Sequence, residues 1–325
     1  MTVLCLVERD GSGAADVSLR ALTLARQLAE SAGGEVAAVL FAGPAEPDQD
    51  AAGAAARQLA ASGVGVAYVV EAGAGYAPAA WARGLAELAV SAAAAAAVAA
   101  ATDRGSEVLA HLGAITGQPV AASCVAARWV APGDCQLTRQ RWAGSLLEDA
   151  TLEAELALLT VAADAVPAPA VPHAAQVEVI GFRPELADTD RAVRARESAD
   201  RGGGVSLATA RVVVGGGRGV GGPEGFGVLE ELAGLLGGVL GVSRVVTSQG
   251  WRPHRQQVGQ TGTKISPELY LACGISGAIQ HMAGCLSAKH IVAVNTDPEA
   301  AIFGVAHYGA VADLFDVAEE LDKLF

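Results

Sequence analysis

Short apolar segments alternate with segments of helical periodicity in both the first and the last parts of the chain, and this alternation limits the folds available to it. In the first part we expect strands at residues 3–7, 35–41 and 65–70, and helices at residues 17–31, 48–61 and 78–88. Such alternation is typical of βαβ units, in which helices cover a parallel sheet. The sequence therefore predicts an α/β fold.

The stretch of residues 91–101 is nearly all alanine, which favours a helix by intrinsic propensity. Its place in the alternation instead favours a buried strand, followed by a helix at residues 107–116. The pattern changes after Val120, and we expect residues 143–147 and 154–162 to pair as antiparallel strands. Three prolines between Asp164 and Pro172 then resist both helix and central strand.

The last part of the chain returns to the alternating pattern. We expect strands at residues 210–214, 244–247, 267–271, 290–295 and 305–313, and helices at residues 226–240, 278–282 and 317–324. A chain of 325 residues is long enough for two domains. The predicted organisation is an N-terminal domain (1–163) that serves as a partner-binding scaffold, a connecting segment (164–207) and a C-terminal domain (208–325). Each domain should contain a mainly parallel sheet flanked by helices.

Composition narrows the possible partners and the location. Apolar residues make up 52% of the chain and aromatic residues 4%, so small and aliphatic side chains must fill the core. A net charge of −13 argues against nucleic-acid binding, because a phosphate backbone would be repelled. Five cysteines without CxxC spacing predict free buried thiols in a reducing compartment. No secretory signal or membrane span is recognisable, so we expect a cytoplasmic protein without membrane insertion.

A glycine-rich loop at residues 215–222 follows the strand expected at residues 210–214. Gly217, Gly219 and Gly222 match the G-x-G-x-x-G pattern of dinucleotide-binding sites. The standard site also needs an acidic residue at the end of the next strand, and residues 247–250 contain none. An NAD site, a plain tight turn and a non-standard nucleotide site remain as alternatives, and the last is favoured.

Further motifs occur after this loop in a fixed order. They are Ser243-Arg244, Gln257-Val-Gly-Gln-Thr-Gly262, Cys273-Gly-Ile-Ser-Gly-Ala-Ile-Gln-His281, Val294-Asn-Thr-Asp-Pro-Glu299 and Tyr308-Gly-Ala-Val-Ala-Asp-Leu-Phe315. Together with Gly216-Gly-Arg-Gly219, this ordered set closely resembles the alpha subunits of electron transfer flavoproteins. The N-terminal part resembles the family only in its α/β organisation and in Arg141-Trp-Ala-Gly-Ser145.

The resemblance implies that the C-terminal domain is a non-standard Rossmann-like domain that binds FAD. The residues expected to contact FAD are Arg218, Ser243, Arg244, Val258, Gly259, Gln260, Thr261, Gly262, Ser276, Gly277, Ala278, Ile279, Gln280, His281, Asn295, Asp313 and Leu314. No catalytic or metal-binding residues are predicted, because no paired carboxylates, Ser-His-Asp set or metal cluster is recognisable.

By the same resemblance, Thr261 should lie near flavin N5 and Arg244 beside the isoalloxazine. His281 should lie near flavin O2, where a protonated or donor imidazole would stabilise negative charge. Arg218 is expected near the flavin or its phosphates.

The other expected contacts are to the pyrophosphate and the adenosine. Residues 274–278 would seat the pyrophosphate before a helix, and Asn295 with residues 313–314 would contact the adenosine. Without the resemblance, Ser276 could equally be a plain N-cap, His281 a satisfied core or surface histidine, and Asn295 a turn residue.

As a member of such a family, the chain would be an electron carrier without substrate turnover of its own. It would form a heterodimer with a beta subunit that carries AMP in many members. The expected donors are acyl-CoA or other primary dehydrogenases, and the expected acceptor is a quinone-linked oxidoreductase. The alternatives are an electron-bifurcating flavoprotein subunit, an NAD-linked Rossmann oxidoreductase and a nucleotide-binding module with structural FAD. Thr263, His307 and Ser248-Gln249 depart from the residues usual in the family.

Overall fold

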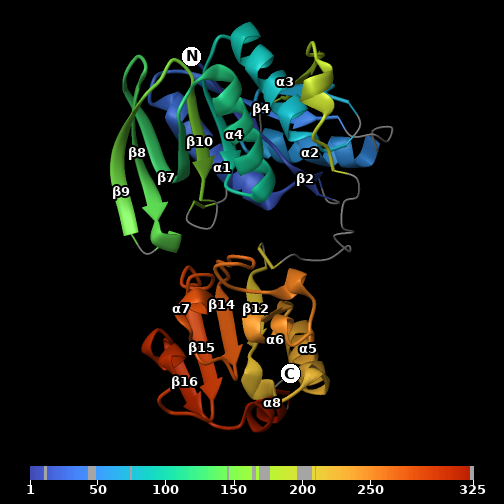
Figure 1. Ribbon diagram of the computed structural model, residues 1–325, viewed down its shortest axis with the longest axis vertical. Coiled ribbons are helices and arrows are strands. Elements are labelled where there is room, and N and C mark those ends of the chain that lie inside the picture. The colour runs from blue at the N-terminus through green and yellow to red at the C-terminus, as the bar shows by residue number, and fades with distance from the viewer. Residues whose placement is uncertain are drawn as a thin grey trace. The chain divides into compact units, whose positions relative to one another are not determined.

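The computed structural model describes residues 1–10, 13–42, 49–73, 75–144, 146–162, 166–167, 176–195, 207–208 and 210–322. The chain forms two compact units, residues 1–201 and residues 202–325 (Figure 1). We predicted domains at 1–163 and 208–325, and those boundaries stay a prediction.

The strands of the first unit are β1 (Thr2–Leu6), β2 (Arg9–Asp10), β3 (Gly13–Ala14), β4 (Glu35–Phe41), β5 (Val66–Val70), β6 (Ala94–Ala100), β7 (Val120–Ala131), β8 (Asp134–Arg141), β9 (Leu146–Glu153), β10 (Ala157–Val161) and β11 (Glu178–Phe182). Its helices are α1 (Asp16–Glu30), α2 (Gln49–Ala61), α3 (Pro78–Ser91) and α4 (Asp103–Thr116), with 3₁₀ turns η1 (Trp142–Gly144) and η2 (Asp188–Arg191). In the described residues, the main sheet has the strand order β11-β5-β4-β1-β6-β10-β7-β8-β9.

The first sheet is parallel from β11 to β7, and helices cover both of its faces. Helices α1 and α2 pack on one face with Val3 and Cys5 of β1, whereas α3 and α4 pack on the other face with Leu4 and Leu6. A strand that is buried on both faces is typical of a parallel sheet between helices. The expected α/β class is therefore confirmed for this unit.

The alanine-rich segment forms β6, at the centre of this sheet, as its place in the alternation predicted. Its residues from Ala96 to Ala100 are at most 2% exposed and alternate between the two cores. Helix propensity is overridden here because both faces of the strand are buried under helices.

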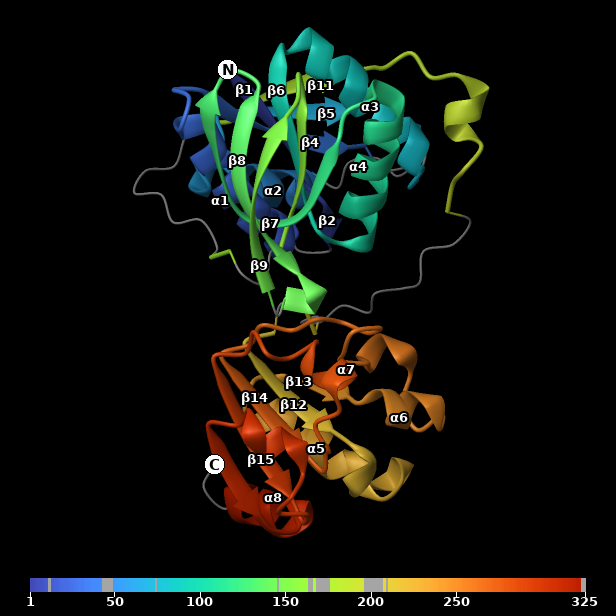
Figure 2. The same ribbon diagram turned by 60° about the vertical axis from the view of Figure 1, so that its left-hand side comes forward.

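The expected antiparallel pairing of residues 143–147 with 154–162 was wrong. Strand β9 pairs antiparallel with β8, which pairs antiparallel with β7, while β10 lies parallel between β6 and β7. Figure 2 shows the long ribbon that β7, β8 and β9 form. The sequence signal that we overlooked was Pro132-Gly133, a pair that favours tight turns, where Gly133 adopts φ +83° between β7 and β8.

Part of the expected connecting segment belongs to the first sheet. Strand β11 lies within residues 164–207 and pairs in parallel with β5 along its whole length. The pattern of residues 177–182 predicts a strand, which β11 confirms, but its pairing with a distant strand is not indicated by the local sequence.

The strands of the second unit are β12 (Val212–Gly216), β13 (Val239–Val242), β14 (Leu269–Cys273), β15 (His290–Asn295) and β16 (Tyr308–Val311). Its helices are α5 (Phe226–Leu235), α6 (Arg244–Ser248), α7 (Ile279–Met282) and α8 (Leu314–Asp322), with 3₁₀ turns η3 (Arg218–Val220), η4 (Pro223–Gly225), η5 (His254–Gln256) and η6 (Ala301–Gly304). All neighbouring strands are parallel, in the order β13-β12-β14-β15-β16. Helices α5, α6 and α8 pack on one face, and α7 and η6 on the other.

The strand expected at residues 244–247 was wrong, because these residues form α6. The helix expected at residues 226–240 is also too long, since α5 ends at Leu235 and β13 begins at Val239. Gly237 adopts φ +63°, and a Cβ atom at Gly238 would lie 2.5 Å from the carbonyl oxygen of Val212. Gly237 and Gly238 end the helix and allow β13 to lie close to β12. The strand therefore begins at Val239 rather than at the expected residue 244.

Two expectations from composition can be compared with the described residues. All five cysteines are free and buried, and burial raises the pKa of Cys124 to about 12 and that of Cys135 to about 11. Among the described residues, no helix has the length and apolar character needed to cross a bilayer.

Leu159 offers a test of the first core, because this side chain of β10 is fully buried. Leu159→Ala should lower the free energy of unfolding by about 2–5 kcal/mol through lost burial and a cavity. Val90→Ala is the matched control, since Val90 is 84% exposed and its truncation should change the free energy by less than about 0.5 kcal/mol. Chemical denaturation followed by circular dichroism measures both, and equal effects would contradict this account of the core.

Candidate functional site

The five strands of the second sheet end at one edge, because all of them are parallel. The chain moves outward in opposite directions from β12, first to β13 and then to β14, so the strand order reverses between β12 and β14. Ligands of open α/β sheets gather at such a carboxyl edge, next to the reversal. The predicted FAD residues follow the ends of these strands, except for the loop at residues 258–262, which pairs with the end of β13.

Two loops meet backbone to backbone at this reversal. The amide of Gly217 donates to the carbonyl of Cys273 over 2.9 Å, and the amide of Gly219 donates to the carbonyl of Gly274 over 3.0 Å. A Cβ atom at Gly217 would lie 2.2 Å from the oxygen of Gly274, and one at Gly219 would lie 2.7 Å from its Cα atom. The glycines are therefore required for contact between the loops, which is a structural reason for them beside the expected phosphate contact.

The glycine loop differs from a standard dinucleotide-binding loop in its surroundings. The turns η3 and η4 follow β12, and α5 begins only at Phe226, beyond the last glycine of the motif. The end of β13 lies at Val242 rather than at Thr247, but Ser243 and Arg244 follow it and again supply no acid. The corrected strand position thus leaves the argument against an NAD site unchanged.

The loop at residues 257–263 is tied to two neighbours by its backbone. The amide of Val258 donates to the carbonyl of Val242 over 2.9 Å, and the amide of Gln260 donates to the carbonyl of Gln280 over 2.7 Å. Gly259 adopts φ +145°, and Gly284 packs so closely that its Cβ atom would lie 2.4 Å from the Cα atom of Gly259. The loop therefore lies between the end of β13 and the α7 segment.

Gln257 orients the side chain of Thr261 within this loop. Its amide nitrogen donates to Thr261 Oγ1 over 3.0 Å, and its amide oxygen lies 2.5 Å from Thr247 Oγ1 on α6. Because Thr261 accepts a hydrogen bond from Gln257, its own hydroxyl proton stays free to donate. Gln257 is only 2% exposed, and sequence reasoning included it in the motif without assigning it a role.

The turn after β14 places Ser276 at the surface and Gly277 against η6. Gly277 adopts φ +83°, and its Cβ atom would lie 2.2 Å from the amide nitrogen of Ile302. Helix α7 has only four residues, and its N-cap is Ala278 without a side-chain cap. Ser276 is therefore not the N-cap of α7, and any anion held here would depend on loop amides more than on a helix dipole.

His281 lies beneath this surface and is 6% exposed. Its Nε2 atom lies 2.7 Å from the hydroxyl of Tyr270, whereas its Nδ1 atom is buried without a hydrogen-bond partner among the described residues. Burial lowers the pKa of His281 to about 4, and the Val258 carbonyl offsets part of this effect. The imidazole is therefore neutral at pH 7 in the chain without cofactor.

The last two strands end in residues that also hold the local backbone. Asn295 donates from its side-chain amide to the carbonyl of Ile275 over 3.0 Å and accepts from the amide of Asp297 over 3.0 Å. Asp313 accepts from the amide of Phe315 over 2.8 Å at the start of α8. Asn295 therefore connects the end of β15 to the turn after β14, in addition to being the turn residue we expected.

Exposure separates most of the predicted residues into two groups, and Gly262 and Asn295 are half-buried. The first group is exposed at the surface and comprises Arg218, Arg244, Gln260, Thr261, Ser276, Ala278, Ile279, Gln280 and Asp313. Val258 and Leu314 belong to the second group, which is buried in the core and offers a ligand little more than its backbone. Ser243 is also buried, and its hydroxyl has no hydrogen-bond partner among the described residues.

The departures from the family pattern have local roles. His307 accepts a hydrogen bond from the amide of Ile291 at Nδ1, over 3.0 Å, so this nitrogen carries no proton. Thr263 contributes its backbone to the loop, by donating to the carbonyl of Gln257 over 2.7 Å. In the first unit, Trp142 of the Arg141–Ser145 motif is 81% exposed at φ +50°, and Ser145 lies outside the described residues.

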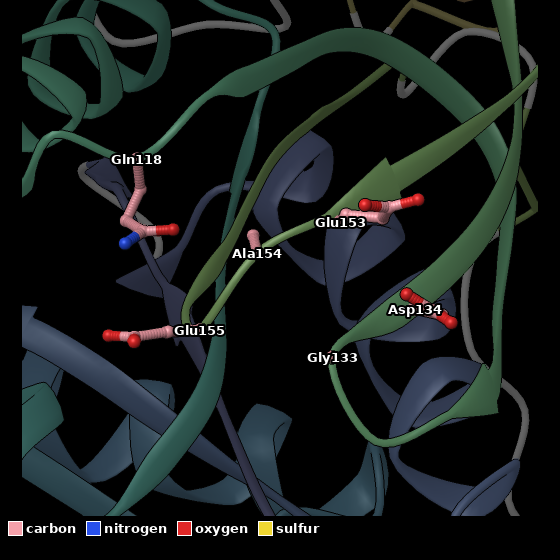
Figure 3. A pocket seen from close by; sticks show the side chains of 6 residues that line it. All are labelled: Gln118, Gly133, Asp134, Glu153, Ala154 and Glu155. Atoms are coloured by element: carbon pink, nitrogen blue, oxygen red, sulfur yellow. The ribbon is translucent and has the colours of Figure 1, made fainter.

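A surface hollow of the first unit contains none of the predicted FAD residues (Figure 3). Gln118 and Glu155 line one side of it, and Asp134 and Glu153 line the other. Three carboxylates would repel a phosphate-bearing ligand. Across the described residues, no group of histidine, cysteine, aspartate and glutamate is arranged to hold a metal ion.

His281 should make stability depend on pH. Its pKa is about 4 in the folded chain and about 6.5 when unfolded, so the unfolded state binds more protons between these values. Stability should then be complete above pH 6.5 and fall as the pH drops toward 4, by up to about 3 kcal/mol. In His281→Asn this pH-dependent part of the stability should be absent. Chemical denaturation of the unsubstituted chain and of His281→Asn, both without cofactor, gives the difference in their free energies of unfolding. The same difference at pH 7 and at pH 4.5 would contradict the prediction.

Comparison with known proteins places the chain among flavoproteins. The electron transfer flavoprotein domain matches residues 3–187, and the electron transfer flavoprotein FAD-binding domain matches residues 206–286. The alpha subunit of the electron transfer flavoprotein from Mycobacterium tuberculosis is 40% identical over 322 residues, which cover 99% of this chain and 97% of the relative. The corresponding subunit from Mycobacterium leprae is 38% identical over 98% of this chain and 96% of the relative.

A third relative matches a shorter part of the chain at higher identity. The alpha subunit from Paracoccus denitrificans is 56% identical over 115 residues, or 35% of this chain and 37% of the relative. The two domain matches together extend over most of the chain, and the mycobacterial relatives match nearly all of it. The chain therefore belongs to the family of electron transfer flavoprotein alpha subunits.

Proposed function

We propose that this chain binds FAD at the carboxyl edge of its second sheet and carries electrons between protein partners. Bound FAD supplies one-electron and two-electron redox chemistry. The observation that supports this most directly concerns Ser243 Oγ and His281 Nδ1, two of the buried polar atoms that have no hydrogen-bond partner among the described residues. Buried polar groups are normally hydrogen-bonded, and a bound ligand is one explanation when they are not. Both residues belong to the set that the family resemblance assigned to FAD.

The remaining residues of that set suit the parts of a dinucleotide. Arg218 and Arg244 are exposed cations, appropriate for phosphates or for a flavin that gains negative charge on reduction. Ile279 is 79% exposed, an unusual position for a large apolar side chain and one that an aromatic ring could cover. Thr261 has a free hydroxyl proton to donate. We propose that all seventeen predicted residues contact FAD by side chain or backbone.

The chain would work as one half of a heterodimer with an electron transfer flavoprotein beta subunit, which would hold AMP. Electrons would come from primary dehydrogenases, among which acyl-CoA dehydrogenases of fatty acid β-oxidation are our first candidates. They would pass one at a time to a quinone-linked oxidoreductase. The chain itself would turn over no substrate, and buried free thiols suit the reducing environment of the cytoplasm.

Co-expression with a beta subunit tests the cofactor. We expect a yellow 1:1 complex with a flavin spectrum and one FAD per heterodimer. A colourless complex that takes up no FAD would contradict the proposal, and binding of NADH in place of FAD would support an NAD-linked oxidoreductase. Two flavins per heterodimer would identify an electron-bifurcating protein. Flavin that no dehydrogenase can reduce would instead indicate a structural role.

Gly219→Ala tests the location of the site. The added methyl group would push apart the loops that meet at Gly274, at a cost of about 1.4 kcal/mol or more, so FAD should bind about tenfold more weakly or worse. Gly227→Ala on α5 is the control, because a Cβ atom there meets nothing within 4 Å. Fluorescence titration of the apo-heterodimers with FAD measures both, with circular dichroism to verify folding. Equal affinities would place FAD elsewhere.

Arg244→Ala tests the electrostatic role of the exposed cation. Loss of a positive charge beside the flavin should disfavour the reduced form, and the two-electron midpoint potential should fall by roughly 30 mV, the equivalent of about 1.4 kcal/mol. Arg255→Ala, which removes another exposed cation of the same unit, is the control. Spectroelectrochemical titration gives both potentials. An unchanged or raised potential in Arg244→Ala would contradict the assignment of Arg244.

A further inference from the structure

Tyr270 and His281 form a buried side-chain pair that neither the motifs nor the strand pattern indicated. Tyr270 lies on β14 and is fully buried, and its hydroxyl oxygen is 2.7 Å from Nε2 of His281. The neighbouring strand leaves room for the phenol, since a Cβ atom at Gly215 would lie 2.4 Å from the Tyr270 hydroxyl. The absence of a side chain at Gly215, two residues beyond the register partner of Tyr270, therefore makes room for this hydroxyl beside His281.

The position of the phenol proton follows from the surroundings of Tyr270. Burial raises the pKa of Tyr270 well above its ordinary value, and the thiols of Cys285 and Cys273 add to the effect, so the phenol keeps its proton. Within the described part of the chain, this hydroxyl has no recorded hydrogen-bond partner other than His281. If Nε2 donated instead, the phenol proton and a bare Nδ1 would both be buried without partners, which is the costlier arrangement, so the phenol donates to Nε2.

The position of the imidazole proton follows in turn. A nitrogen that accepts a hydrogen bond carries a lone pair, so Nε2 is bare and the single ring proton of neutral His281 lies on Nδ1. Nδ1 is the buried atom of His281 that has no partner among the described residues. The Val258 backbone acts on the imidazole, but no described residue makes a hydrogen bond of normal geometry to Nδ1. The Nδ1–H group is therefore the donor that His281 has left for a ligand.

We infer that Tyr270 is a positioning residue, which holds His281 in its Nδ1–H tautomer so that His281 offers FAD a neutral N–H donor. The tautomer rests on the protein geometry alone, whereas the identity of the ligand rests on the function proposed above. Without the phenol, Nε2 could carry the proton instead. Nδ1 would then present a lone pair, which repels the carbonyl oxygens of a flavin.

Nitrogen-15 NMR of the full chain without cofactor tests the tautomer. The sequence has six histidines, and the pair of ring signals that disappears in His281→Asn belongs to His281. We expect the signal of a protonated nitrogen for Nδ1 and that of a bare acceptor for Nε2. In Tyr270→Phe, the Nε2 signal should shift toward the protonated form. Tyr308→Phe is the control, because Tyr308 is 68% exposed and contacts no residue of the pair. A proton on Nε2 in the unsubstituted chain, or identical signals in Tyr270→Phe, would overturn the assignment.

FAD binding by the heterodimer tests the role of the donor. Tyr270→Phe should weaken FAD binding roughly three- to tenfold, the effect of one neutral hydrogen bond. The same substitution in the His281→Asn background should have no effect, because the imidazole that it orients is gone. An equal loss in both backgrounds would show that Tyr270 acts through packing and would overturn the positioning role. If the unsubstituted heterodimer takes up no FAD, the proposed function and the donor role fail together, and the NMR result alone decides the tautomer.

Discussion

The contact between the loops after β12 and β14 determines how the second unit can hold a ligand. These loops leave the sheet where its strand order reverses, and they touch through backbone atoms, with Gly219 donating to the carbonyl of Gly274. Side chains at this point would separate them, because parallel neighbouring strands bring their ends within one strand spacing of each other. The glycine motif thus has a structural role, the close contact of two loops, that does not depend on a bound phosphate.

A second constraint is that buried polar side chains beside this edge need hydrogen-bond partners. Gln257 and Tyr270 are buried, and each makes a hydrogen bond to a side chain that belongs to the predicted site, Thr261 and His281 respectively. In both pairs the site residue is left with a free donor, the hydroxyl proton of Thr261 and the N–H of His281. The N–H of His281 is buried, so leaving it without a partner costs free energy in the unliganded chain, and a ligand that accepts from it recovers that cost. The supporting residues therefore select for a ligand that is rich in acceptor atoms at this surface, as a flavin ring is.

The sequence predicted the parallel α/β organisation because apolar periodicity reports burial on two faces directly, and even the alanine run of β6 was placed correctly by its position. It failed where one or two glycines decide the outcome. The pair Gly237-Gly238 divides an apparently continuous helix into α5 and β13, and this division displaced the next predicted strand onto α6. The pairing of β11 with β5 and the Tyr270–His281 contact join residues that local patterns do not relate. Their recognition requires the register of neighbouring strands, which a single sequence does not contain.

The ordered motifs are informative for a reason that the sheet makes explicit. In a parallel sheet each strand must be followed by a crossover before the next one begins, so residues that meet at the carboxyl edge are necessarily spaced along the chain. Gly217, Ser243, Ser276 and Asp313 follow the ends of β12, β13, β14 and β16, and Asn295 is the last residue of β15, so their sequence order is that of the five strands. One such motif alone arises readily in a chain with 40 glycines. Five in order reflect one edge of one sheet, and it is the geometry of that edge, rather than the glycine loop, that relates this chain to the flavoproteins.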